Sequence, residues 1–136
     1  MLLRSLEALE GQDAMRSLRG VKRADKGSGF KPHELCNGPS KLTQAFGITK
    51  ANSNQIDLST SQQLWLEEEI EMQESNIVTT RRVGIDNYDK EWVMKPLRFY
   101  VKGNRSVSLR DKQAESALVP DRRKTFNVFD VIKLQR

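Results

Sequence analysis

The pattern of apolar and polar positions first becomes helical between residues 11 and 19. Ala14, Met15 and Leu18 recur at the spacing that places them on one face of an α-helix. Asp13 has the short acceptor side chain that is favoured at a helix N-cap. The sequence therefore predicts a short helix with one buried face in this region.

Alternating or β-branched patterns predict strands in several other places. These segments are Met1–Glu7, Leu64–Leu66, Ile77–Ile85, Pro96–Lys102 and Val107–Leu109. The segment at Leu64 is also compatible with a helix, and its alternation favours a strand. The last two segments flank the turn pair Gly103-Asn104, so we expect them to pair with each other. From Lys112 onward the pattern dissolves, which is typical of a tail.

A second helix is predicted from Pro39, which suits the first helical position, to Gly47, which can end a helix in a left-handed conformation. Asn37 is a suitable N-cap. The first turn offers free N–H groups and a partial positive charge, with Ser40 and Lys41 beside it. Such a helix start suits an oxyanion, above all a phosphate. The alternative is an ordinary capped helix whose lysine points into water.

Composition narrows the possible chemistry. The 136 residues suffice for one domain, and a hydrophobic content of 37% predicts a thin core. Cys36 and His33 are single residues of their kinds, which excludes a disulfide framework and argues against a zinc site or a Ser-His-Asp triad. No phosphate-binding glycine loop of a nucleotide enzyme is present, so we expect no cofactor. Apolar runs are too short for us to expect a membrane span.

The net charge of +5 is unevenly distributed. Six basic residues and one acid lie between Arg16 and Lys31, and further basic residues follow Pro120. An acidic block, Glu67 to Glu74, lies between these regions. Segregated charge favours a polyanionic partner on one face, and a solvated basic loop is the alternative.

Several short motifs occur in an order that resembles a known family. They are Leu2–Glu7, Met15-Arg16, Leu18-Arg19, Glu34–Cys36, Gly38–Leu42, Arg82–Gly84 and Lys95–Val101. Their combination resembles the C-terminal part of the alkyladenine (3-methyladenine) DNA glycosylases of the animal type. The resemblance covers roughly residues 2 to 110, so we expect residues 1–110 to be the C-terminal part of such a domain and residues 111–136 to be a basic tail.

This resemblance implies a fold and an activity. The fold would be a mixed α+β single domain, a curved antiparallel sheet with short helices, truncated at its N-terminal side. The activity would be base excision repair by a monofunctional enzyme that flips an alkylated or deaminated purine and hydrolyses its N-glycosidic bond. The implied partner is duplex DNA containing damaged purines, with no membrane, for a protein that is a monomer when complete. The implied compartment is the nucleus, with the mitochondrion as a second one.

The resemblance also implies two sets of site residues. The residues of the base pocket are Leu2, Arg4, Val83 and Gly84. The phosphate contacts are Arg19, Ser40, Lys41 and Lys50. From the residues alone, Arg4 could instead pair with an acid and Leu2 could belong to the core.

The catalytic glutamate of the family has no counterpart here, because it would lie before the start of this chain. We therefore assign no catalytic residue and expect the chain alone to bind DNA weakly without excising bases. Loss of general-base help alone slows such a reaction ~10²–10⁴-fold. The alternative is a non-catalytic nucleic-acid-binding or interaction module derived from the same fold.

Overall fold

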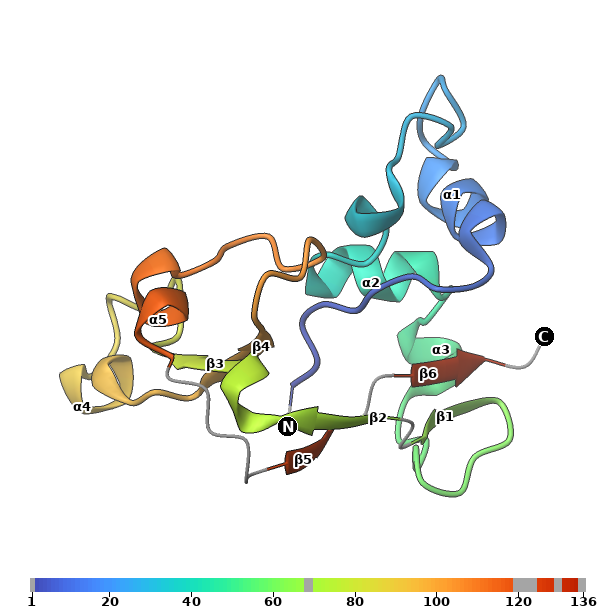
Figure 1. Cartoon of the computed structure of the whole chain (residues 1–136). Helices are drawn as coiled ribbons and strands as arrows, with labels where there is room; N and C mark the ends of the chain where they lie inside the picture. The colour runs from blue at the N-terminus through green and yellow to red at the C-terminus, as the bar shows by residue number, and fades with distance from the viewer. Residues whose placement is uncertain (1, 68–69, 119–124, 129–130, 135–136) are drawn as a thin grey trace. The chain divides into compact units, whose positions relative to one another are not determined.

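The computed structural model describes residues 2–67, 70–118, 125–128 and 131–134. The chain divides into two compact units (Figure 1). The first unit contains residues 1–69, 105–108 and 129–136, and the second contains residues 70–104 and 109–128.

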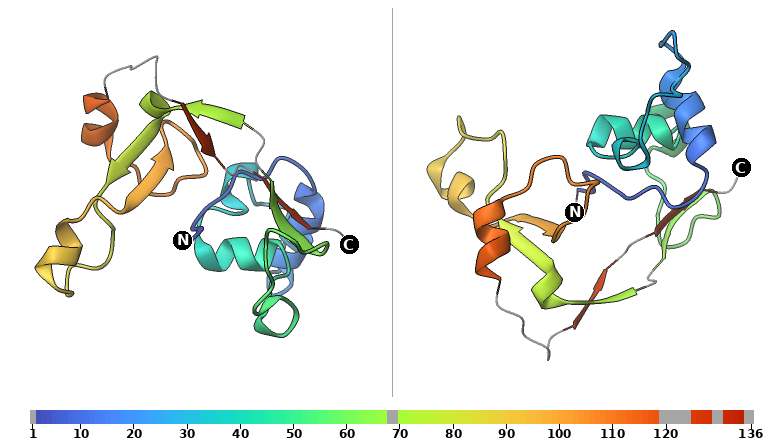
Figure 2. Two further views of the ribbon diagram at one scale, coloured as in Figure 1. Left: turned by 90° about the horizontal axis from the view of Figure 1, so that it is seen from below. Right: turned by 45° about the horizontal axis from the view of Figure 1, so that its top comes forward.

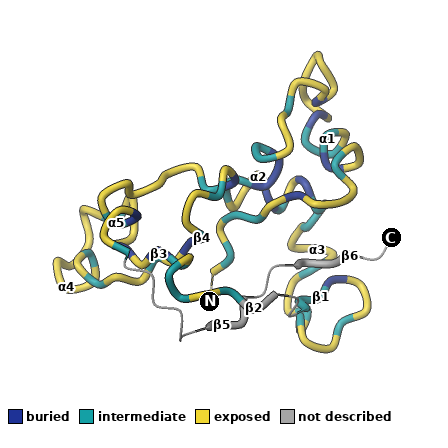
Figure 3. The backbone as a smooth tube through the Cα atoms, in the orientation of Figure 1, coloured by how far each residue is buried: buried dark blue, intermediate teal, exposed yellow. Residues whose placement is uncertain are grey.

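The first unit is built mainly from short helices. Its elements are α1 (Gln12–Gly20), the 3-10 helix η1 (Pro32–Glu34), α2 (Pro39–Ala45), α3 (Lys50–Ser53), β1 (Leu64–Glu67) and β6 (Val131–Leu134). Helices α1 and α2 pack against each other, and β1 pairs antiparallel with β6. The core consists of Ala8, Met15, Leu35, Cys36, Leu42 and Ala45. Figure 3 shows buried backbone segments, in dark blue, around α1 and α2.

The second unit combines antiparallel strand pairs with two short helices (Figure 2). Its elements are β2 (Ile70–Gln73), the 3-10 helix η2 (Glu74–Asn76), β3 (Ile77–Thr80), α4 (Lys90–Met94), β4 (Arg98–Val101), α5 (Lys112–Ala117) and β5 (Thr125–Val128). Strand β2 pairs with β5, and β3 pairs with β4. The opposed residues Val78 and Tyr100 are buried, whereas Phe99 on the other face of the pair is exposed.

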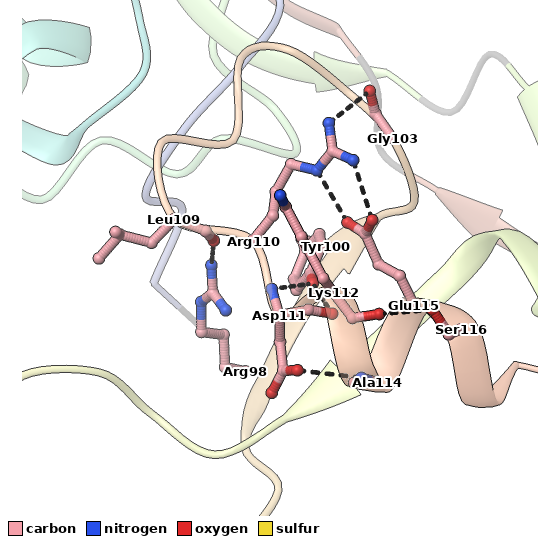
Figure 4. Close-up of polar contacts among 10 residues, drawn as sticks. All are labelled: Arg98, Tyr100, Gly103, Leu109, Arg110, Asp111, Lys112, Ala114, Glu115 and Ser116. Atoms are coloured by element: carbon pink, nitrogen blue, oxygen red, sulfur yellow. Dashed lines mark hydrogen bonds and ion pairs between the residues drawn. The ribbon is translucent and has the colours of Figure 1, made fainter.

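Polar contacts connect helix α5 to the rest of the second unit (Figure 4). Arg110 donates two hydrogen bonds of 2.9 Å to the carboxylate of Glu115. The backbone N–H of Asp111 donates to the hydroxyl of Tyr100 at 2.8 Å, and the carboxylate of Asp111 caps α5 by accepting from Ala114 N at 2.9 Å. Because these contacts join β4 to the start of α5, residues just beyond 110 are part of the packed unit.

The α+β class and antiparallel pairing expected from the sequence are confirmed. The helices predicted near residues 11–19 and from Pro39 are present, and Gly47 has the left-handed φ of 63°. The strands predicted at Leu64, Ile77 and Pro96 are also present. The first extends one residue further than predicted, to Glu67, and the other two are shorter than predicted. The described strands form three two-stranded sheets.

Two predicted strands are wrong. Residues 2–9 have no regular secondary structure, and Leu6 N donates to the carbonyl of Cys36 at 3.2 Å. That contact tethers the segment without the ladder of bonds that a strand requires. Residues 107–109 are also not a strand, and the predicted partner segment pairs with β3.

The expected ends of several elements also need correction. Gly11 and Gly38 occupy the N-cap positions assigned to Asp13 and Asn37. Helix α3, capped by Thr49, was not predicted. Helix α5 begins at Lys112, where the sequence pattern indicated a tail. The part of the predicted tail at residues 119–124, 129–130 and 135–136 lies outside the described residues.

Candidate functional site

A basic pocket of about 360 Å³ lies in the first unit. Its lining residues are Arg19, Arg23, Gly29, Phe30, Glu34, Asn37 and Lys41. They come from the end of α1, the loop that follows it, η1, the segment between η1 and α2, and the first turn of α2. Two cationic side chains from the end of α1 and the loop after it therefore meet a third, from α2, at one pocket.

Arg19, in the last turn of α1, joins this helix to the segment that precedes α2. Its Nη1 donates to the backbone carbonyls of Glu34 and, at 2.9 Å, Leu35. Burial is the main cause that lowers the pKa of Arg19, and the nearby charge of Arg23 lowers it further. The Arg19 side chain, which the family resemblance assigns to a phosphate contact, thus already donates hydrogen bonds to backbone carbonyls.

The loop after α1 is held against the helix by two glycines. A Cβ at Gly20 would lie 2.2 Å from the carbonyl carbon of Lys26, and a Cβ at Gly27 would lie 2.2 Å from the carbonyl oxygen of Arg16. Gly27 also has a φ of +86°. In addition, Arg16 Nε donates to the carbonyl of Phe30 at 3.1 Å. Close backbone approach therefore determines where this basic loop runs.

Phe30 orients the two arginines of the pocket. Its ring centroid is 4.1 Å from the guanidinium carbon of Arg19 and 4.6 Å from that of Arg23. Arg23 also donates to both carboxylate oxygens of Asp25, at 2.8 and 3.0 Å, and this pairing lowers the pKa of Asp25. The Arg23 side chain remains 51% exposed.

The start of α2 contributes Lys41 to the pocket. Lys41 Nζ donates to Asn37 Oδ1 at 2.8 Å. Ser40 Oγ accepts from Gln44 Nε2 at 3.3 Å and does not line the pocket, and neither does Lys50, at the start of α3. Of the four predicted phosphate contacts, the pocket therefore brings together Arg19 and Lys41.

The four residues predicted for a base pocket lie in different units. Leu2 and Arg4 belong to the first unit, and Val83 and Gly84 belong to the second. Leu2 is 72% exposed, so it is not part of the core, and Val83 is 43% exposed. Their role in binding a base stays a prediction.

Sequence reasoning missed Arg23, Phe30 and Asn37 as pocket residues. The available signal was the glycine pair Gly20 and Gly27, whose spacing encloses the basic residues Lys22, Arg23 and Lys26. Within the described residues there is no cluster of side chains that could hold a metal ion. The same part of the chain contains no helix long and apolar enough to cross a bilayer.

Comparison with known proteins decides the family. The profile of the family described as Methylpurine-DNA glycosylase (MPG) matches residues 1–105. The chain belongs to this family. The family membership that the short motifs indicated is thereby confirmed.

Curated members of the methylpurine-DNA glycosylase family are similar over most of this chain. The DNA-3-methyladenine glycosylase of Homo sapiens is 46% identical over 117 residues, which cover 85% of this chain and 39% of the human protein. The protein of the same name from Rattus norvegicus is 43% identical, over 88% of this chain and 38% of its own length. For the Mus musculus protein the identity is 44%, over 85% of this chain and 35% of its own length. The chain thus spans less than half the length of these relatives.

Proposed function

We propose that this chain is the DNA-binding portion of a glycosylase that removes alkylated or deaminated purines from duplex DNA in base excision repair. The proposal is carried by the convergence of Arg19, Arg23 and Lys41 on one pocket, in a chain that belongs to the methylpurine-DNA glycosylase family. The relatives named above are DNA-3-methyladenine glycosylases, which supports damaged purines as the substrate class. No observation favours the alternative of a non-catalytic module.

The basic pocket would act on the sugar-phosphate backbone rather than on the bases. Guanidinium and ammonium groups bind phosphate oxygens through charge-assisted hydrogen bonds, and such contacts position a protein on DNA without reading its sequence. Ser40 and Lys50, at the starts of two short helices, would add contacts beside the pocket. Each phosphate that is neutralised releases counterions, so binding would weaken as the salt concentration rises.

The other proposed roles concern the flipped base. Leu2, Arg4, Val83 and Gly84 would line its pocket once the family's domain is complete. Hydrolysis then requires a carboxylate that deprotonates the attacking water, and we assign that carboxylate to a part of the family domain that this chain does not cover. We further propose that the complete protein is monomeric and acts in the nucleus.

Fluorescence anisotropy with a labelled duplex tests the binding part of the proposal. The 136-residue chain should bind the duplex, with an affinity that falls linearly on a plot of log K against log salt concentration. Binding that does not respond to salt would contradict a phosphate-contacting role.

A single-turnover excision assay tests the catalytic part. Duplexes containing hypoxanthine or ethenoadenine should bind this chain without release of the free base. Robust release by the purified chain would show that a general base lies within it, and would overturn our assignment of that base to the uncovered part of the domain.

A further inference from the structure

We propose that Arg23 is a phosphate-binding residue of this chain, and that Arg19 is a positioning residue that holds the pocket together. The proposal deepens the proposed function and rests on it, because the ligand is a phosphodiester of the DNA backbone. The motifs of the family resemblance include Arg19 and omit Arg23.

The partners of Arg19 argue against a direct phosphate contact. Its Nη1 is shared between the carbonyls of Glu34 and Leu35, and its guanidinium group lies 4.1 Å from the centre of the Phe30 ring. Leu35 is fully buried. If Arg19 turned toward a ligand, the Leu35 carbonyl would therefore lose its hydrogen-bond donor in the protein interior. Arg19 therefore serves to keep Phe30 and the segment before α2 in place.

The partners of Arg23 allow it to bind an anion. Its side chain is half exposed, and its ion pair with the Asp25 carboxylate lies at the surface, where such pairs are weakly stabilising. The same fork of N–H donors that holds two carboxylate oxygens fits two phosphate oxygens. A phosphate can thus replace Asp25 at Arg23 without loss of hydrogen bonds.

The surroundings of Arg23 keep it at the pocket while that exchange takes place. Arg23 N donates to the carbonyl of Gly20 at 2.9 Å, which anchors the backbone at the end of α1. Phe30 supports the guanidinium group at 4.6 Å. Lys41, which lines the same pocket, supplies a second positive charge to the ligand.

The balance of charge fits one phosphodiester. Arg19, Arg23 and Lys41 line the pocket together with one carboxylate, that of Glu34. Asp25 does not line the pocket but pairs with Arg23, and counting it leaves one positive charge. The Glu34 carboxylate is engaged, because it accepts from Lys31 N at 2.9 Å. A phosphodiester carries one negative charge and would neutralise the pocket.

Two charge-matched variants test this assignment. Arg23→Gln and Lys22→Gln each remove one positive charge from the same loop, but Lys22 does not line the pocket. We measure binding of each full chain to a labelled duplex by anisotropy over a series of salt concentrations. Arg23→Gln should lower the slope of log K against log salt by about 0.9, the value for one phosphate contact, and Lys22→Gln should change it much less.

Asp25→Asn provides an independent test, in which the affinity for DNA is expected to rise rather than to fall. The amide oxygen can still accept from Gly27 N, a bond of 3.0 Å, while the charge that competes with phosphate is removed. This variant should bind the duplex more tightly than the unchanged chain, and Arg23→Lys should recover part of the slope lost in Arg23→Gln. Thermal unfolding followed by circular dichroism checks that each variant is folded.

The outcomes separate the two levels of the proposal. If the unchanged chain shows no salt-dependent binding of DNA, the proposed function and the role of Arg23 both fail. If it binds, but Arg23→Gln and Lys22→Gln have equal slopes, only the role of Arg23 is overturned. Weaker binding by a folded Asp25→Asn variant would overturn it as well.

Discussion

Arg19 and Arg23 are side chains of the same type and lie four residues apart, yet their hydrogen-bond partners differ. Arg19 donates to backbone carbonyls that precede α2, whereas Arg23 pairs with a nearby carboxylate at the surface. The two contacts predict different consequences for the same substitution: one residue supports the fold, and the other is available to a ligand.

Arg19→Ala should lower the free energy of unfolding by about 1–3 kcal/mol, because it leaves the carbonyls of Glu34 and Leu35 without their donor. Arg19→Lys should have an intermediate effect, since an ammonium group keeps the charge but lacks the planar fork. Urea denaturation of the full chain measures both. Arg23→Ala is the control and should leave the midpoint almost unchanged. Equal losses at the two positions would contradict the division of roles.

Gly27 and Gly84 offer a second comparison at the residue scale. Both have a positive φ, but a Cβ at Gly27 would lie 2.2 Å from Arg16 O, whereas nothing lies within 4 Å of a Cβ at Gly84. Gly84→Ala should therefore destabilise the chain by about 1 kcal/mol through its backbone conformation alone. Gly27→Ala should destabilise it by a further ~1–3 kcal/mol and weaken DNA binding, because the loop that carries Arg23 must shift. Thermal melts and anisotropy would test both, and equal melts would show that the close approach is unimportant.

At the scale of elements, short helices depend on specific polar contacts at their ends. Helix α5 has six residues, which is too short to be stable through its own hydrogen bonds. The cap from Asp111 and the ion pair between Arg110 and Glu115 compensate for this length. Helix α3, with four residues, is similarly capped by Thr49.

The ion pair at α5 predicts a pH dependence of stability. The hydrogen bond from Arg110 is the main cause that lowers the pKa of Glu115 below its ordinary value of 4.5. A carboxyl group whose pKa is lower in the folded state stabilises that state above its unfolded pKa, and the contribution disappears as the pH falls through the folded value. Glu115→Gln should therefore melt at a lower temperature than the unchanged chain at pH 7, and the difference should shrink below about pH 4.5.

The control for this measurement is Glu10→Gln, which changes an exposed acid at the start of α1. Its melting temperature should stay close to that of the unchanged chain at neutral pH. If Glu115→Gln behaves in the same way, the contact with Arg110 does not stabilise α5.

At the scale of the whole molecule, the basic pocket and the helical core occur together in the first unit. The core around Leu35, Cys36 and Leu42 supports α1 and α2, and these helices present the basic pocket. The second unit contributes antiparallel strands and exposed apolar residues such as Trp92 and Phe99. DNA binding through the pocket therefore depends on the integrity of the first unit's core.

The reactivity of the Cys36 thiol measures how well the core of the first unit is closed. Its side chain is 1% exposed, and burial raises the pKa of its thiol to about 11. At pH 8 the folded chain should react slowly with iodoacetamide, because the thiol is both protonated and covered. In urea the same thiol should react rapidly, as followed by mass spectrometry. Fast alkylation of the folded chain would show that the core of the first unit opens readily.

Local patterns predicted the two longest helices, α1 and α2, and the strands β1, β3 and β4, but they missed the other helices and strands and several element ends. Met15 and Leu42 lie on buried helix faces, as their spacing predicts. The N-caps were missed, because the position of a cap depends on where the chain enters the helix as well as on the residue type. The strand predicted at Val107–Leu109 is absent, and its expected partner, β4, pairs with β3 from a more distant part of the chain.

The sequence by itself determined the family, the segregation of charge and the places of the two main helices, because these follow from residue types and their spacing. Only the tertiary structure decided which cations share a pocket, and which of them donates to backbone carbonyls rather than to a surface carboxylate. Arg19 is separated by 15 and 16 residues from its carbonyl partners, and Arg23 reaches the same pocket from a loop that Gly20 and Gly27 hold. Contacts across such separations depend on the path of the backbone, which no local pattern specifies.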